Sequence, residues 1–416
     1  MPERRARRGI ATALGVAALL VVLAAPAAGA VSGRLLDLPG MTSFHWAAGT
    51  ARLPDGDVLV AGGYTASFNG NADGTTNTDL FLWPEGRFIS GPPMLQPRAG
   101  QAAVTMNDGR VLEAGGSEGQ YSLTASSEFY DPKVRAFTPG PALSTPRSGA
   151  AAIRLPDSRV LIAGGYDGAG PTTSAELLDP AGTAFTPTGS MAEPRSGAAA
   201  ALLPDGEAIL IGGIEGSYSG STTTEIFNPS RNTFRPGPNL PGQLGGPAAS
   251  LGGSLIVIGP EPAAQILDLS DFSLTVAGSG QLSPPIFSDS AAPLGPGRAL
   301  YAGGQKSAGD GHIAYPVDQA WVFSLPASFK VRRHGPKLLV GVDAPGTVTL
   351  RAPRVVKSRR REGGPGTIKV PLVLTARSRK TLDARGKLRI RIRVKFVPHV
   401  GASGTLRKHL VLTSGF

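Results

Sequence analysis

The chain has 416 residues, of which 41 are Lys or Arg and 30 are Asp or Glu, giving a formal net charge of +11. Glycine (57) and proline (37) are abundant, yet 41% of the residues are hydrophobic, which is sufficient for buried cores linked by many turns. The absence of cysteine excludes disulfide frameworks, thiol catalysis, zinc sites with Cys ligands and iron–sulfur clusters.

Residues 1–30 have the pattern of a cleaved secretion signal. Four arginines between positions 4 and 8 precede the apolar run Ile10–Ala25, and Ala28-Gly29-Ala30 supplies the small residues needed for cleavage before Val31. A retained membrane anchor is the alternative, but the apolar run is shorter than the roughly 20 residues that span a bilayer. We therefore expect a secreted protein, extracellular or associated with the cell surface, whose mature form has no transmembrane span.

Charge divides the remaining chain in two. Residues 31–326 contain 15 basic and 26 acidic residues, for a net charge of −11, whereas residues 327–416 contain 22 and 3, for +19. Such a change in charge predicts a domain boundary. We expect one domain over 31–326 and a second over 327–416.

A repeated phrase fills the acidic part. An apolar strand ending in glycine recurs six times, with the first glycine at positions 62, 115, 164, 212, 259 and 303. A period near 50 residues is typical of a four-stranded propeller blade. In the third repeat we expect antiparallel strands over 135–138, 148–155, 160–163 and 174–179. A single blade cannot cover both of its faces, so the repeats are expected to stack around an axis.

These repeats resemble the kelch family of β-propellers, to which galactose oxidase is related. The resemblance rests on Gly-Gly after an apolar strand, on Pro-Arg-Ser/Ala-Gly before the preceding strand, and on a Glu in each of Ser127–Pro132, Ala175–Pro180 and Thr224–Pro229. The fifth repeat departs from the pattern, because Pro260 replaces the second glycine of the pair and Gln265 replaces the Glu. The resemblance implies an all-β fold with six blades. We expect Arg34–Leu38 to be the first strand of the first blade. No blade would then combine strands from both ends of the domain to close the ring.

One polar position repeats with the fold. The residues 17 positions before the first glycine are His45, Arg98, Arg147 and Arg195 in the first four repeats. If these side chains point inward, they form a cationic arc at the axis that suits carboxylates. By the resemblance, some kelch propellers hold acidic peptides with arginines at this position. The alternative is structural, with each Arg paired to the repeated Glu128, Glu176 or Glu225.

Motifs for catalysis are missing from the sequence. Galactose oxidase chemistry needs a Cys-linked Tyr, which this chain cannot form, and we expect no metal and no cofactor. There is no Gly-x-Ser-x-Gly elbow, His-Glu-x-x-His helix or P-loop. The sequence favours a binding protein, with a carbohydrate-active enzyme of kelch type, such as a sugar epimerase, as the alternative.

The basic tail is expected to form a small immunoglobulin-like β-sandwich. Lys387–Phe396 alternates between cations and apolar residues, the pattern of a half-buried strand. Further strands are expected over 338–342, 347–350, 368–374 and 406–412, with a helical turn over 381–385 and a loop around Arg359–Arg361. The tail also resembles the Lys/Arg-rich β-sandwich appended to many secreted bacterial proteins, on the residues Leu382–Leu388.

The cationic strand face predicts contact with polyanions. Lys387, Arg389, Arg391, Arg393 and Lys395 share this face and would attract polyanions, which outside a cell are anionic cell-wall polymers, acidic polysaccharides or phospholipid surfaces. A solvated face that resists edge pairing is one alternative, and attraction to the acidic domain is another. We expect no nucleic acid partner, because the cationic face of the strand offers no aromatic residue for base stacking. For the acidic domain we expect a protein or an acidic ligand, bound at the axis.

Overall fold

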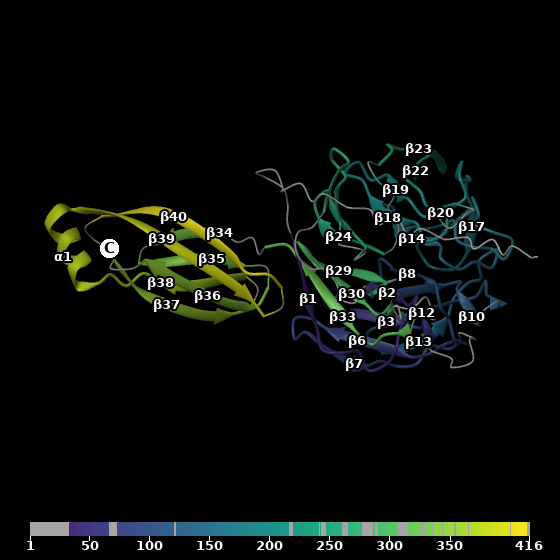
Figure 1. Ribbon diagram of the computed structural model, residues 1–416, viewed down its shortest axis with the longest axis horizontal. Helices are drawn as coiled ribbons and strands as arrows, with labels where there is room; N and C mark the ends of the chain where they lie inside the picture. The colour runs from purple at the N-terminus through teal and green to yellow at the C-terminus, as the bar shows by residue number, and fades with distance from the viewer. Residues whose placement is uncertain are drawn as a thin grey trace, which may run out of the picture. The chain divides into compact units, whose positions relative to one another are not determined.

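A computed structural model of the chain describes residues 33–65, 73–119, 122–215, 219–240, 242, 247–259, 265–276, 286–287, 290–306, 315–326, 330–334, 336–342, 344–352, 355–364, 366–399 and 401–413. The expected signal peptide lies outside the described residues. The described fold is nearly all β, with many four-stranded antiparallel sheets (Figure 1). No helix in the described ranges has the length and apolar character needed to cross a membrane.

Six of these sheets follow one another along the chain. The first contains β2 (Gly49–Arg52), β3 (Val58–Ala61), β6 (Thr78–Leu82) and β7 (Arg87–Ser90). The second contains β8 (Ala102–Thr105), β9 (Val111–Ala114), β12 (Ser127–Asp131) and β13 (Ala136–Pro139). The third contains β14 (Ala151–Arg154), β15 (Val160–Ala163), β16 (Ala175–Leu178) and β17 (Phe185–Pro187).

The next three sheets repeat this order. The fourth contains β18 (Ala199–Leu202), β19 (Ala208–Ile211), β22 (Thr224–Asn228) and β23 (Thr233–Pro236). The fifth contains β24 (Ala248–Gly252), β25 (Leu255–Ile258), β26 (Gln265–Asp268) and β27 (Ser273–Val276). The sixth contains β29 (Ala291–Gly295), β30 (Arg298–Ala302), β33 (Ala320–Ser324) and, from the start of the chain, β1 (Arg34–Asp37).

Short strands connect some of the main strands. The pieces β4 (Tyr64–Thr65), β5 (Asp73–Gly74), β10 (Ser117–Gly119) and β11 (Ser122–Leu123) form one small sheet. The pair β20 (Ile214–Glu215) and β21 (Ser219–Gly220) forms another. The third consists of β28 (Ile286–Phe287), β31 (Gln305–Lys306) and β32 (Tyr315–Pro316).

The expected division of the repeats into sheets is wrong by one strand. The segment expected to open the third repeat is β13, and it pairs with β12 in the second sheet. In the same way β1 pairs with β33, with Leu36 opposite Val322, so the first strand of the chain completes the last sheet. The expectation that no sheet combines strands from both ends of the repeats is therefore wrong. The period fixes the length of a repeat but not the strand with which each sheet begins, so the sequence left this choice open.

Apolar clusters pack each sheet against the next. One cluster joins Leu59 of the first sheet to Val111 of the second, and equivalent clusters link each later pair of sheets. The sixth cluster joins Leu300 and Val322 of the last sheet to Val58 of the first. The sheets therefore form a closed cycle of apolar contacts, an arrangement compatible with a β-propeller.

The double glycines hold neighbouring sheets close together. Gly62 and Gly63 have φ angles of 65° and 99°, which only glycine adopts without strain. A Cβ on Gly62 would lie 2.4 Å from the carbonyl oxygen of Arg98, and Gly63 N donates to that oxygen at 2.6 Å. Gly304 N donates to the carbonyl oxygen of His45 at 2.9 Å, which links the last sheet to the first. At these two junctions the Gly-Gly motif thus positions one sheet against the residues that precede the next.

The basic tail contains two further sheets. One consists of β34 (Lys330–His334), β35 (Lys337–Val342) and β38 (Gly366–Pro371). The other has the order β37 (Val356–Gly363), β36 (Gly346–Ala352), β39 (Lys387–Pro398) and β40 (Gly404–Thr413). The helix α1 (Ala376–Arg385) is capped by Thr375, whose side chain accepts from Ser378 N, and ends at Gly386 with φ 69°. One apolar cluster, which includes Val340, Val370 and Phe396, lies between the two sheets.

The expected strands of the tail are present, and two strands were not expected. These are β34 and β37. Arg359–Arg361 were expected in a loop and lie instead in β37, where Arg360 pairs with Thr349 of β36. Pro353 before these arginines and Gly363-Gly364-Pro365 after them suggested a loop, but the residues from Val356 to Gly363 form one strand.

Candidate functional site

The four repeated polar residues lie inside the sheets. His45, Arg98, Arg147 and Arg195 are each at most 1% exposed. Each side chain contacts the carbonyl oxygen of the glycine 17 residues later, over 2.6 to 2.9 Å. Each side chain therefore links the segment that precedes the first strand of a sheet to the Gly-Gly turn of the same sheet.

A carboxylate accompanies each of the four. Arg98 Nε lies 2.8 Å from Glu128, Arg147 Nη2 lies 3.0 Å from Glu176, and Arg195 Nε lies 3.5 Å from Glu225. In the first sheet the equivalent pair is His45 with Asp79, over 2.9 Å. The Glu side chains also accept backbone N–H groups, as Glu128 does from Leu95 at 2.7 Å. These contacts are those of the structural alternative, and they occupy the guanidinium donors within the sheets.

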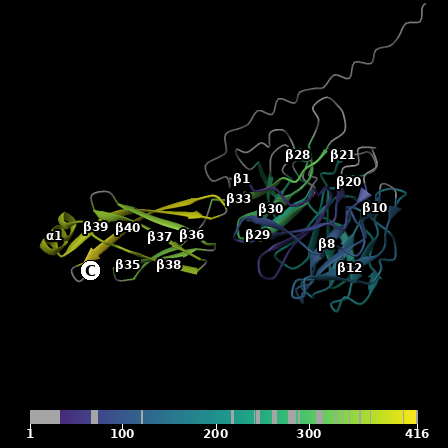
Figure 2. The ribbon, with the colours of Figure 1, turned by 90° about the horizontal axis from the view of Figure 1, so that it is seen from below.

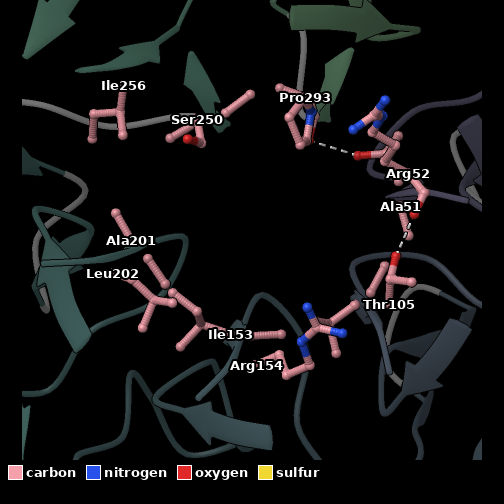
Figure 3. A pocket seen from close by; sticks show the side chains of 18 of the residues that line it. Ala51, Arg52, Thr105, Ile153, Arg154, Ala201, Leu202, Ser250, Ile256 and Pro293 are labelled. Carbon is pink, nitrogen blue, oxygen red and sulfur yellow. Dashed lines mark hydrogen bonds between the residues drawn. The ribbon is translucent and has the colours of Figure 1, made fainter. Parts of the chain in front are cut away.

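A cavity lies where the first strands of the six sheets meet. Its volume is about 720 Å³, and β2, β8, β14, β18, β24 and β29 all contribute to its wall. Most of the lining side chains are small, such as Ala103, Ala152 and Ala200. The strand face therefore leaves an open space instead of a packed centre (Figure 3).

Two arginines give this cavity its charge. Arg52 and Arg154 are exposed and line it, with Thr105 between them in the second sheet. Arg154 Nη1 donates to the carbonyl oxygen of Met106 at 3.1 Å, and Thr105 Oγ1 donates to that of Arg52 at 2.6 Å. Figure 3 shows these three side chains beside Leu202 and Ser250 around the same space. Of the described residues that line the cavity, none is acidic.

The described cavity is not lined by the predicted site residues, which are His45, Arg98, Arg147 and Arg195. Its two arginines, Arg52 and Arg154, were not among the residues predicted from the sequence. A signal was present, because both arginines lie ten residues before the first glycine of their repeats, and both precede Leu-Pro-Asp. The same position holds Thr105 and Leu202 in the second and fourth repeats, so residue type alone did not reveal it.

The polyanion-binding residues expected in the tail share one exposed face. Lys387, Arg389, Arg391, Arg393 and Lys395 are all exposed, while Ile390, Ile392 and Val394 between them are buried. The structure adds Arg351, Arg359 and Arg360, which line a groove of about 1080 Å³ together with Arg393 and Lys395. The cationic face therefore extends across neighbouring strands.

One buried carboxyl group has no counterpart in the other sheets. Glu113 lies on β9, is 0% exposed, and occupies the position of Val60 and Ile162. In the described part of the chain neither of its carboxylate oxygens accepts a hydrogen bond of normal geometry, and Gln101 is the one neighbouring donor that lowers its pKa. Burial raises the pKa of Glu113 well above its usual value, and repulsion by Glu128 adds to this, while Arg98 opposes it.

Comparison with known proteins gives no assignment. No protein-family model matches the chain, and no curated protein sequence matches it.

Proposed function

We propose that the chain is a secreted binding protein made of a six-bladed propeller of kelch type and an immunoglobulin-like β-sandwich. The six apolar clusters between successive sheets support the propeller, because each sheet is covered on both faces only if the cycle closes. The Gly-Gly turns, the buried Arg–Glu pairs and the completion of the last sheet by β1 support the kelch type. The two sheets around one cluster support the sandwich.

The propeller is proposed to bind an acidic ligand or an acidic protein segment at its axis. The observation that carries this is the axial cavity, where the exposed guanidinium groups of Arg52 and Arg154 face a space with no carboxylate among its described lining residues. Guanidinium groups bind carboxylates through paired donors, and a concave site reduces their exposure to water.

Binding has more support than catalysis at this cavity. A sugar epimerase or a glycosidase needs a general acid or base within reach of its substrate. The carboxylates that accompany the repeated arginines of the sequence are those of Glu128, Glu176 and Glu225, and they are buried in ion pairs. The side chains that line the cavity offer hydroxyl and guanidinium groups, which recognise anions but supply no general base.

The tail is proposed to attach the protein to anionic polymers of the cell surface. Its support is the exposed cationic face of β39, which continues onto β36, β37 and β40. Electrostatic attraction of this kind raises the rate of association and brings the propeller close to its ligand.

The axial site can be tested with peptide and glycan arrays probed by the mature chain. Bound probes should carry negative charge, and the variant Arg52→Gln/Arg154→Gln should weaken their binding by about tenfold or more. Arg87→Gln/Arg231→Gln removes the same charge from exposed positions outside the cavity and should leave binding unchanged. Binding that is equal in both variants would refute a site at the axis.

A further inference from the structure

Cations form rows across the outer face of the four-stranded sheet in the tail. Arg393 of β39 pairs with Arg351 of β36 on one side and with Arg407 of β40 on the other, and all three side chains are exposed. In the next row Lys395 lies between Thr349 and Thr405, and Thr349 pairs in turn with Arg360 of β37. Figure 2 shows these strands in the same layer.

This arrangement disfavours folding, and an anionic partner would relieve the repulsion between the cations. Like charges directly opposite each other destabilise a sheet, because their Cβ atoms are only about 5 Å apart. In the described part of the tail, the one carboxylate opposite a residue of this face is Glu362, which pairs with Thr347 at the end of the sheet. Its Oε1 atom contacts His399 Nε2 over 2.8 Å. The charge of the central row is thus left for a ligand to neutralise.

The groove gives the ligand a place and a direction. It is about 1080 Å³ in volume and is lined by Arg351, Arg359, Arg360, Arg393 and Lys395, together with the hydroxyl groups of Thr347, Thr349, Ser403 and Thr405. Along β39 the cations continue past the groove at every second residue to Lys387. Alternate residues of a strand are about 7 Å apart, so this line of charge suits an extended polymer.

We propose that the groove binds a linear polymer that carries phosphate groups in its main chain. The cations are about 5 Å apart across the strands and about 7 Å apart along them, which requires a ligand with closely spaced anions. A polymer with phosphates in a flexible main chain can place its anions at these spacings, and each phosphate offers oxygens to cations of two neighbouring strands, whereas the sugar rings of an acidic polysaccharide hold its carboxylates at fixed positions. The guanidinium groups of Arg and the hydroxyl groups together donate the hydrogen bonds that phosphate oxygens accept. This inference rests on the proposed attachment role of the tail and narrows its ligand to polyol phosphate polymers or inorganic polyphosphate.

Nucleic acid has the same phosphate chemistry but fits this face less well. The outward residues of β40 are Thr405, Arg407, His409, Val411 and Thr413, and those of β39 are cations and Val397. Single strands bind mainly by stacking bases on Phe, Tyr or Trp, which the described residues of this face lack.

The test measures binding of the full mature chain to poly(glycerol phosphate), to inorganic polyphosphate, to polygalacturonate and to single-stranded DNA over a range of salt concentrations. Both phosphate polymers should bind at least about tenfold more tightly than polygalacturonate. The logarithm of the affinity should fall with the logarithm of the salt concentration with a slope of about −3.5, from roughly −0.7 for each of five neutralised phosphates. A difference between the two phosphate polymers identifies the natural source.

The central row is tested by Arg351→Gln/Arg393→Gln/Arg407→Gln. This variant should lose about tenfold in affinity and flatten the salt slope by about 2. The control is Arg377→Gln/Arg379→Gln/Lys380→Gln, which removes three exposed cations from α1 and should keep both values. Because the row variant relieves repulsion, its thermal stability should equal or exceed that of the wild type.

The remaining outcomes separate this inference from the proposed function. Equal affinity for polygalacturonate would overturn the phosphate assignment while leaving attachment to anionic polymers in place. Tighter binding of DNA would assign the groove to nucleic acid. Failure to bind any of these polymers at low salt would overturn both the inference and the attachment role.

Discussion

Arg98 and Glu128 form an ion pair inside the second sheet, with Nε 2.8 Å from Oε1 and with each side chain 1% exposed. The guanidinium group also donates to the carbonyl oxygens of Gly115 and Ser126 at 2.9 and 2.8 Å. Because both charges are removed from water, each depends on the other and on these backbone acceptors. One side chain therefore connects three segments of its sheet.

Replacing Arg98 with Gln should destabilise the protein strongly. The change leaves the Glu128 carboxylate buried without its cation, which costs about 3–5 kcal/mol in the free energy of unfolding. The matched control is Arg87→Gln, because Arg87 pairs with Glu85 where both side chains are more than half exposed. We expect a cost below about 1 kcal/mol there. Urea unfolding of both variants measures the difference, and equal midpoints would contradict a structural role for Arg98.

Asp79 should contribute to stability only while it is ionised. Burial raises its pKa, but hydrogen bonds from His45 and Thr42 outweigh burial and hold the pKa below the usual 3.8. A carboxyl group whose pKa is lowered by folding stabilises the protein above 3.8, and this contribution is lost as the pH falls through the lowered pKa. Asp79→Asn should therefore cost about 1–3 kcal/mol at neutral pH.

The measurement is urea unfolding of Asp79→Asn and wild type from neutral to acidic pH. The difference between them should shrink below pH 3.8 as the wild type becomes protonated. The control is Asp108→Asn, because Asp108 is 49% exposed beside Arg110 and should contribute less than about 1 kcal/mol. A difference for Asp79→Asn that stays constant with pH would show that its charge has no role.

The link between the last and first sheets can be tested at a glycine. Gly303 has φ 66°, and a Cβ there would lie 1.8 Å from the carbonyl oxygen of His45. Gly197 has φ 67°, and a Cβ there would meet no atom within 4 Å. Both Ala variants therefore share the backbone strain of roughly 1–2 kcal/mol, and only Gly303→Ala adds an overlap.

We expect Gly303→Ala to cost at least about 2 kcal/mol more than Gly197→Ala, because the neighbouring sheet must move away. Thermal unfolding of the two variants measures this. The same loss in both would mean that the close approach of the last sheet to the first contributes nothing to stability.

The sequence predicted the repeats and the outward face of β39 because both depend on local patterns. Gly62 and its equivalents mark the period, and the alternation from Lys387 to Phe396 indicates a strand with one buried face. The assignment of β13 to the second sheet and of β1 to the last depends on which strands pair across the fold. No local pattern records that choice, because each strand has an apolar face that fits either neighbour.

The candidate site was harder to predict than the fold. Arg98 and its equivalents repeat conspicuously, yet their side chains turn into the sheets and pair there with Glu128, Glu176 and Glu225, which lie 29 or 30 residues later in the chain. Arg52 and Arg154 reach the axial cavity because β2 and β14 are the first strands of their sheets, and this side of each sheet lines the cavity. Only the closed arrangement of the sheets shows that this side faces a cavity. In the same way, the alignment of Arg351 and Arg407 with Arg393 follows from pairing between distant strands.

Glu113 should make stability fall as the pH rises. Its pKa is raised well above 4.5, chiefly by burial, so the neutral carboxyl is the form that the fold accepts. A carboxyl group whose pKa is raised by folding does not destabilise the protein at a pH below the pKa that it has in the unfolded chain. Stability is lost as the pH rises through the pKa that it has in the folded protein. Replacing it with Leu, the type found at the equivalent Leu210, removes both the charge and the unpaired oxygens. Glu113→Leu should therefore stabilise the protein by about 1–3 kcal/mol at neutral pH.

Unfolding of Glu113→Leu, Glu113→Gln and wild type in urea, from acidic to neutral pH, separates charge from polarity. The advantage of both variants over the wild type should grow as the pH rises above 4.5, and Leu should exceed Gln because the amide keeps polar atoms in an apolar site. Glu118→Gln serves as the control, since Glu118 is exposed and its replacement should change little at any pH. If Glu113→Leu instead destabilised the protein, with a loss largest at neutral pH, the ionised carboxylate would be the form that the fold requires. Its partner would then be sought among Gln101 and the backbone near Gly49, whose missing Cβ makes room for the carboxyl group.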